Sequence, residues 1–145
     1  MAGRGDRSLT AEGQRFRLQL RTLPDVGTRD LTEAIFKPTV DANDNVLVYF
    51  WAPNCGPCDV LTPTYEASSN KNFDVVHGKV NFEAEKHLAK VAQVTLLPTL
   101  MAFKKGKLVF KQAGIANPKV MDDLVQHLRA YKVKDDPAAG QRRLI

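Results

Sequence analysis

Apolar residues fall into two kinds of pattern along this chain, continuous β-rich runs and stripes with helical spacing. The run at 46–51, Val-Leu-Val-Tyr-Phe-Trp, contains no charged or amide side chain, which is typical of a central strand covered on both faces. Further strands are predicted at 74–80, 99–103 and 107–112. The turn at 104–106 is short enough to join the last two as an antiparallel hairpin.

Four helices are predicted before, between and after these strands. The first three cover 32–41, 56–69 and 83–94, and Asn117 and Pro118 open the fourth as N-cap and first-turn proline. Its apolar stripe, expected to be buried, consists of Val120, Met121, Leu124, Leu128 and Tyr131. The order α, β, α, β, α, β, β, α predicts an α/β fold with a central mixed β-sheet flanked by helices on both faces.

The length of 145 residues indicates one domain with an extension at each end. Residues 1–24 hold five arginines against two acidic residues and are predicted to form a flexible basic N-terminal extension. Apolar and polar residues alternate at 16–21 as in a short strand, but we favour a disordered extension there. The domain itself is predicted at 25–132, followed by a solvated C-terminal tail at 133–145.

Charge and hydropathy exclude several classes of function. Much of the net charge of +5 comes from the N-terminal extension, and the domain offers no basic stripe with base-reading side chains, so we expect no nucleic-acid partner. No stretch approaches about eighteen apolar residues, so we expect no membrane span. The N-terminus lacks the apolar region of a secretory signal. An organelle transit peptide is an open alternative, since such peptides are rich in arginine and poor in acidic residues, although Asp6 and Glu12 argue weakly against it. A cytoplasmic protein is therefore predicted.

The two cysteines, Cys55 and Cys58, are separated only by Gly56 and Pro57. A structural disulfide that closes so short a loop stabilises little, because loop-closure entropy grows with loop size. A zinc site needs about four ligands, and the chain has no other cysteine and no histidines at ligand spacing, so no metal is expected. Redox chemistry is the interpretation that remains.

The predicted position of this pair, at a strand-to-helix junction, gives each cysteine a role. Cys55 lies ahead of the free N–H groups of the helix, which favour its thiolate. We therefore expect Cys55 to be the attacking thiol, and its position at the start of the helix predicts that it is the more exposed of the two. Cys58, one turn along and buried, is within reach to resolve the mixed disulfide. Gly56 and Pro57 limit the freedom of the loop, which favours closure of the pair.

Several motifs occur together with this pair: Phe50-Trp51-Ala52, Cys55-Gly56-Pro57-Cys58, Pro63, Leu97-Pro98-Thr99, Phe103-Lys104-Lys105-Gly106 and Ala113-Gly114. Together they resemble the thioredoxin family over roughly residues 28–132. The resemblance implies a thioredoxin-like fold and a monomeric electron carrier that reduces disulfides in protein substrates. It also implies that thioredoxin reductase, an NADPH-linked flavoprotein, reduces the protein again, with no bound cofactor besides the redox-active disulfide.

The resemblance also assigns residues around the pair. Pro98 matches the cis-proline of the family, and the peptide groove beside it matches Thr95, Leu97 and Gly114. Residues that support the site are a tryptophan packed under it, a kinking proline and a lysine buried near the second cysteine, which match Trp51, Pro63 and Lys79.

Three positions depart from the family pattern. Tyr49 replaces a buried aspartate held to accept the proton of the second cysteine, Asn54 replaces a second tryptophan in the groove, and Asp59 stands where a basic residue is common. A tyrosine, with a pKa of about 10, is a poor base near neutral pH, so we favour a core aromatic with its hydroxyl on water or backbone.

These departures leave alternatives to a general thioredoxin open. One is a specialised thioredoxin-like protein with its own reductase or a narrow set of targets. Another is a redox-linked chaperone or binding module with weak reductase activity. A thiol oxidase or isomerase is disfavoured, because that role suits an oxidising compartment and no export signal is present.

Overall fold

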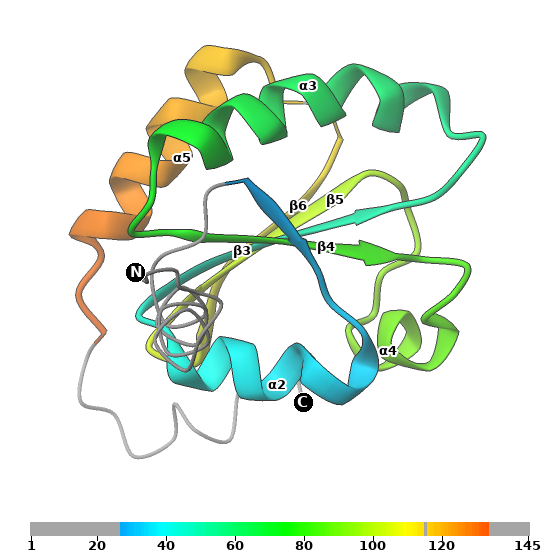
Figure 1. Cartoon of the computed structure of the whole chain (residues 1–145), viewed down its shortest axis with the longest axis horizontal. Helices are drawn as coiled ribbons and strands as arrows, with labels where there is room; N and C mark the ends of the chain where they lie inside the picture. The colour runs from blue at the N-terminus through cyan, green and yellow to red at the C-terminus, as the bar shows by residue number, and fades with distance from the viewer. Residues whose placement is uncertain (1–26, 115, 134–145) are drawn as a thin grey trace, which may run out of the picture.

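The computed structural model describes residues 27–114 and 116–133, in which a five-stranded sheet lies between two layers of helices (Figure 1). The predicted N-terminal extension, and the predicted C-terminal tail except its first residue, lie outside the described residues. In chain order the elements are β2 (Thr28–Asp30), α2 (Glu33–Ala42), β3 (Asn45–Trp51), α3 (Gly56–Lys71), β4 (Val76–Asn81), α4 (Lys86–Val91), β5 (Thr99–Lys104), β6 (Lys107–Ala113) and α5 (Pro118–Ala130).

The strands follow the order β2-β4-β3-β5-β6 across the sheet. Strand β3 is central and runs parallel to β4 and antiparallel to β5. Strand β2 is parallel to β4, and β6 closes the other edge as an antiparallel hairpin with β5. The predicted mixed sheet and the predicted hairpin are both confirmed.

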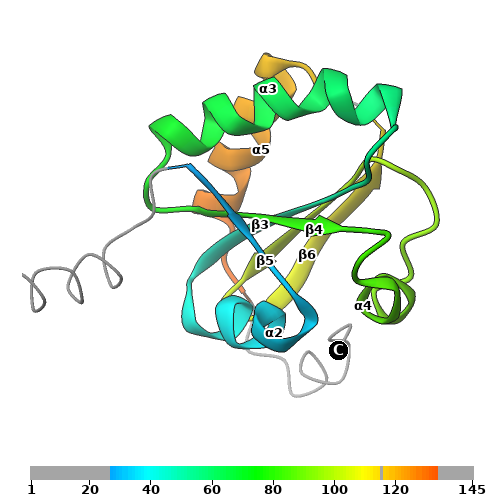
Figure 2. The same ribbon diagram turned by 45° about the vertical axis from the view of Figure 1, so that its right-hand side comes forward.

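Helices α3 and α5 cover one face of the sheet, and α2 and α4 cover the other (Figures 1 and 2). Side chains of β3 alternate between the two layers because successive residues of a strand point to opposite faces. Val48 and Phe50 pack with residues of α2 and α4, whereas Leu47 and Tyr49 pack with residues of α3 and α5. Burial on both faces explains the uninterrupted apolar run of β3, which leads into the cysteine motif.

The edge strand β2 was not predicted from the sequence. It has only three residues, too few for an alternating pattern to stand out. Its ladder continues through the Leu31 N–H, which donates to the carbonyl of Lys79 across 2.8 Å. The Leu31 side chain lies over Gly78, where a Cβ atom would come within 2.4 Å of it. A long-range contact with a glycine therefore seats this strand, and no local pattern signals it.

Two helix predictions need correction. Helix α4 is shorter than the predicted 83–94, because the Asn81 side chain accepts hydrogen bonds from the next backbone N–H groups and turns the chain first. In α5 the buried residues are Met121, Val125 and Leu128, while Val120 and Tyr131 are about half exposed. The spacing of four and then three residues is the one that keeps side chains on a single helix face.

Candidate functional site

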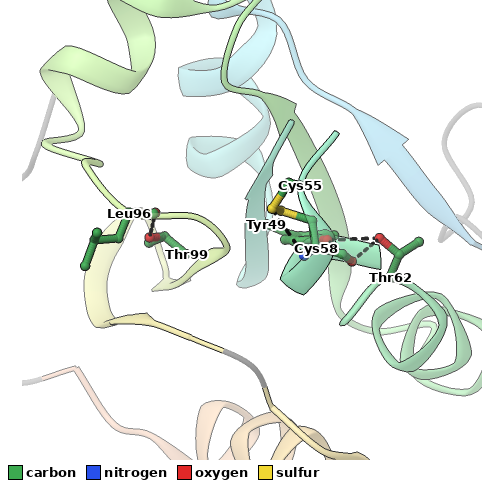
Figure 3. The surroundings of a disulfide bond; sticks show 6 residues. All are labelled: Tyr49, Cys55, Cys58, Thr62, Leu96 and Thr99. Carbon is green, nitrogen blue, oxygen red and sulfur yellow. Dashed lines mark hydrogen bonds between the residues drawn. A yellow bond between two sulfur atoms is a disulfide. The ribbon is translucent and has the colours of Figure 1, made fainter. Parts of the chain in front are cut away.

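Both cysteines lie where the central strand β3 passes into helix α3 (Figure 3). Cys55 is the N-cap of α3, with an extended backbone, and Cys58 lies in the first turn. They form a disulfide, with 5.2 Å between their Cα atoms. Cys58 is 1% exposed, whereas Cys55 is partly exposed. The predicted contrast between an accessible and a buried cysteine is confirmed.

The backbone at the start of α3 directs a hydrogen-bond donor at the sulfur of Cys55. The N–H of Cys58 donates to Cys55 Sγ across 3.2 Å. The first N–H groups of a helix lack intrahelical acceptors and carry partial positive charge, so in the reduced protein they favour a thiolate on Cys55. Pro57 occupies one of these first positions, where its lack of an N–H costs no hydrogen bond. Gly56 and Pro57 are both exposed. Asp59, in the same turn, suits the helix dipole but repels a thiolate.

Trp51 and Lys79, which the resemblance implies to be supporting residues, contact each other. Trp51 ends β3 and packs against the cluster of buried residues that contains Cys58. The Lys79 ammonium lies 5.1 Å from the centre of the Trp51 ring and 3.9 Å from the carboxylate of Glu66. Its side chain is 16% exposed, so this lysine, which the resemblance implies to be buried, is largely but not completely buried.

The predicted groove residues lie on three loops. The Leu97–Pro98 peptide bond is cis, as the resemblance implies, and Pro98 is buried while Thr95 is exposed. The N–H of Gly114 donates to the Pro98 carbonyl across 2.9 Å, so these two loops are adjacent. Leu96 and Thr99, which lie on either side of this cis bond in the sequence, are drawn in Figure 3, where the Thr99 hydroxyl donates to the carbonyl of Leu96.

Asn54 and Gly114 both adopt a left-handed backbone conformation. Asn54 has φ 61° and is exposed in the turn just before Cys55. Asparagine tolerates this conformation better than most residues, whereas a bulky tryptophan would be strained in it. Gly114 has φ 113°, which favours glycine. The departure at Asn54 therefore fits the local backbone of this chain.

Tyr49 is fully buried beneath the first turn of α3. Its Oη lies 2.8 Å from the carbonyl oxygen of Cys58 and 2.9 Å from Thr62 Oγ1. Burial, above all, raises the pKa of Tyr49, and the nearby carboxylates of Asp59 and Glu66 raise it further, against a lowering effect of the Thr62 hydrogen bond. The hydroxyl therefore stays protonated near neutral pH. The prediction of a core aromatic bonded to backbone is confirmed.

Thr62 belongs to this site but was not identified from the sequence. Its hydroxyl donates to the Cys58 carbonyl across 2.9 Å and also meets Tyr49 Oη. Its position four residues after Cys58 in a predicted helix is a signal that could have suggested the first bond, because threonine commonly bonds to the carbonyl of residue i−4. Its contact with Tyr49, thirteen residues away, depends on how β3 and α3 pack.

A metal-based site has no support in the described part of the chain. No group of three or more histidine, cysteine, aspartate or glutamate side chains is placed to hold a metal ion there. Within the same residues, no helix is long and apolar enough to cross a membrane.

Comparison with known proteins gives matches that span most of the chain. The family model for thioredoxin matches residues 27–130. The chain is 38% identical over 102 residues to a protein from Streptomyces coelicolor described as putative thioredoxin 2, a match that covers 70% of this chain and 76% of that protein.

Solved structures agree with the sequence comparison. A mutant thioredoxin from Halobacterium salinarum is similar with a TM-score of 0.69 and 26% identity, covering 77% of this chain and 97% of that one. A chain in the complex of ferredoxin:thioredoxin reductase with thioredoxin f2 is similar with a TM-score of 0.66 and 26% identity, covering 72% of this chain and 96% of that one.

Proposed function

Because the chain belongs to the thioredoxin family and is a thiol–disulfide oxidoreductase, we propose that it is a general reductant of protein disulfides, reduced again by an NADPH-linked flavoprotein thioredoxin reductase. The observation that carries this proposal is the asymmetry of the cysteine pair. A partly exposed sulfur receives a backbone N–H, and its 1% exposed partner lies one helical turn away.

The reaction consists of two exchange steps at these sulfur atoms. The Cys55 thiolate attacks one sulfur of the substrate disulfide, the substrate S–S bond breaks, and one substrate thiolate leaves. The Cys58 thiol then gives up its proton to solvent, and its thiolate attacks Cys55 Sγ, which releases the second substrate thiolate and forms the Cys55–Cys58 disulfide; the released substrate thiolates take up protons from solvent. Two electrons pass from the dithiol to the substrate, and the pair is the only redox group that the reaction needs.

The identity of the reductase can be tested directly. The oxidised protein is mixed with insulin, NADPH and a flavoprotein thioredoxin reductase, and NADPH oxidation is followed. Steady turnover that the Cys55→Ser variant lacks supports the proposal. Turnover only with reduced ferredoxin and a ferredoxin:thioredoxin reductase would replace it, an outcome made relevant by the similarity to a chain from that complex.

A specialised reductase is the second candidate, and Asn54 favours it. An exposed asparagine beside Cys55 gives the docking surface less apolar area than a tryptophan would. Slow insulin reduction together with fast reduction of one target would support this candidate. The proposal also includes a monomeric protein in the cytoplasm, without nucleic-acid or membrane partners. Purification as a monomer and recovery from the cytoplasmic fraction would support it.

A further inference from the structure

Three oxygen atoms meet just beneath the disulfide, from Tyr49, Thr62 and the backbone of Cys58. The distances are 2.8 Å from Tyr49 Oη to the Cys58 carbonyl oxygen, 2.9 Å from Thr62 Oγ1 to the same oxygen, and 2.9 Å between the two hydroxyls (Figure 3). Two hydroxyl protons are shared among three contacts. Either both hydroxyls donate to the carbonyl, or one donates to the carbonyl and accepts a hydrogen bond from the other. The carbonyl of Cys58 is held under either arrangement.

The helix needs this support because of Pro63. Proline has no N–H, so the carbonyl of Asp59, four residues earlier, lacks the i+4 hydrogen bond that a regular helix would give it. The turn that carries Cys58 is therefore weakened directly after that cysteine. The two hydroxyls add hydrogen bonds at the neighbouring carbonyl, that of Cys58.

Tyr49 itself is firmly held. Its ring packs against that of Tyr65, with 5.0 Å between the ring centres, and Tyr65 packs in turn against His77 at 5.2 Å. The Tyr65 hydroxyl donates to the carbonyl of Gly78 across 2.7 Å. These aromatic contacts fix the Tyr49 hydroxyl relative to the central strands. The position of the Cys58 carbonyl therefore depends on the sheet as well as on its own helix.

We propose that Tyr49 and Thr62 form a carbonyl clamp that positions Cys58 for the resolving step. This inference rests on the two-step dithiol reaction proposed above and adds two positioning residues to it. Residue 58 has its N–H directed at Cys55 Sγ and its C=O held by the clamp. The backbone on both sides of the buried sulfur is therefore fixed, which keeps that sulfur within reach of Cys55 once the mixed disulfide has formed.

The clamp predicts a selective kinetic effect. The attacking step needs only Cys55 and the substrate, whereas the resolving step needs Cys58 Sγ to approach Cys55 Sγ in line with the mixed disulfide. Loss of one hydroxyl removes about one net hydrogen bond and should slow resolution roughly five- to tenfold. Because the remaining hydroxyl can still donate to the carbonyl, loss of both should slow resolution by more than the product of the two single effects.

The test uses Tyr49→Phe, Thr62→Val and the double variant, reduced chemically so that no reductase is required. Each is mixed with a peptide disulfide, quenched with acid at intervals, and analysed by mass spectrometry for mixed disulfide and for the released second thiol. Thr62→Ser keeps the hydroxyl and should restore resolution. Thr64→Val is the matched control, since Thr64 lies about 200° away around the helix.

Unchanged attack, slowed resolution and a double variant slowed by more than the product of the two single effects would support the clamp. Equal slowing of both steps, unchanged resolution in both single variants, or a double effect no larger than that product would overturn it. Thr62 is partly exposed, so Thr62→Val is informative even if the buried Tyr49→Phe variant does not fold. Failure of the two-step reaction would look different, because the wild type would then form no mixed disulfide, and failure of the proposed reductase would not affect this assay, in which no reductase is present.

Discussion

The two ends of helix α3 are both rich in polar contacts, but they use them differently. At its N-terminal end, the contacts surround a sulfur that stays partly exposed. At its C-terminal end, Ser68 and His77 are each 1% exposed, and Ser68 Oγ lies 3.0 Å from His77 Nε2. By itself, a serine bonded to a histidine resembles the nucleophile and base of a hydrolase.

The remaining contacts give this serine–histidine pair a structural role. His77 Nδ1 donates to the carbonyl of Val75 across 2.9 Å, which leaves Nε2 to accept from the Ser68 hydroxyl. Asn72 donates to both oxygens of Ser68 and accepts from Arg129, which also binds Asp74. Each of these polar side chains bonds to another polar group, and Ser68 and His77 are closed off from solvent. The two ends of α3 therefore differ in access: Cys55 stays partly exposed, whereas the serine–histidine pair does not.

Replacement of Cys58 should have the largest effect on the reactive end. Cys58→Ser should abolish turnover and accumulate a mixed disulfide through Cys55, because no thiol remains to resolve it. Non-reducing mass spectrometry with a disulfide-bearing protein measures the adduct, and Cys55→Ser should form none. Adducts on Cys58 in the Cys55→Ser variant, at the rate seen with Cys55, would reverse the assigned roles.

Acid should act mainly on the structural end, through His77. Burial lowers the pKa of His77 to about 4, while hydrogen bonding to Val75 opposes this shift. Its ordinary pKa is about 6.5, so between these values the unfolded chain binds a proton that the folded protein does not. The stabilisation is fully present above about pH 6.5 and is lost as the pH falls toward 4.

The change should amount to roughly 2 to 3 kcal/mol between pH 7 and pH 4.5. Denaturant unfolding at the two pH values measures it, and His77→Gln is the control that removes the titrating group. The variant should be less stable at pH 7 but lose less stability on acidification, with disulfide reduction at pH 7 unchanged. Identical pH dependence in both proteins would show that His77 does not carry the effect.

Tyr49→Asp should sharpen the comparison by adding a base to the reactive end. A carboxylate near Cys58 should speed resolution at pH 7 by roughly tenfold, since the gain from general-base catalysis exceeds the loss of the clamp. The variant should also be less stable, because it creates a cavity and buries a charge, and Lys79 is already engaged with Glu66 and Trp51. The resolving rate is measured against pH alongside thermal unfolding.

The wild-type profile should rise with the thiol pKa values alone, whereas the Tyr49→Asp profile should gain a separate carboxylate limb. A folded Tyr49→Asp variant with no rate gain at pH 7 would mean that the wild-type site already handles the proton of Cys58 adequately. The interpretation of Tyr49 as a poor substitute for the aspartate would then be wrong.

Removal of residues 1–24 should have the smallest effect. Both ends of α3 lie within 27–133, and no predicted site residue lies in the extension. Turnover with insulin and the unfolding midpoint should therefore match those of the full chain. A folded truncated protein without activity would place part of the site in that extension.

The sequence alone determined the features that depend on local chemistry. The spacing of Cys55 and Cys58, the apolar run of β3 and the turn between β5 and β6 predicted the redox pair, the central strand and the hairpin, because each depends on neighbouring residues. The resemblance to thioredoxins added Pro98. The departure at Tyr49 was also visible, together with the expectation that its hydroxyl would bond to water or backbone.

Only the tertiary structure decided which groups the polar side chains would meet. It brought Tyr49 and Thr62 to the Cys58 carbonyl, and it seated β2 through Leu31 on Gly78. It also closed the network around His77, which the sequence showed only as a histidine without ligand spacing. The physical reason is common to all three: a hydrogen bond or a packing contact between distant residues depends on how strands and helices pack, which local patterns do not specify.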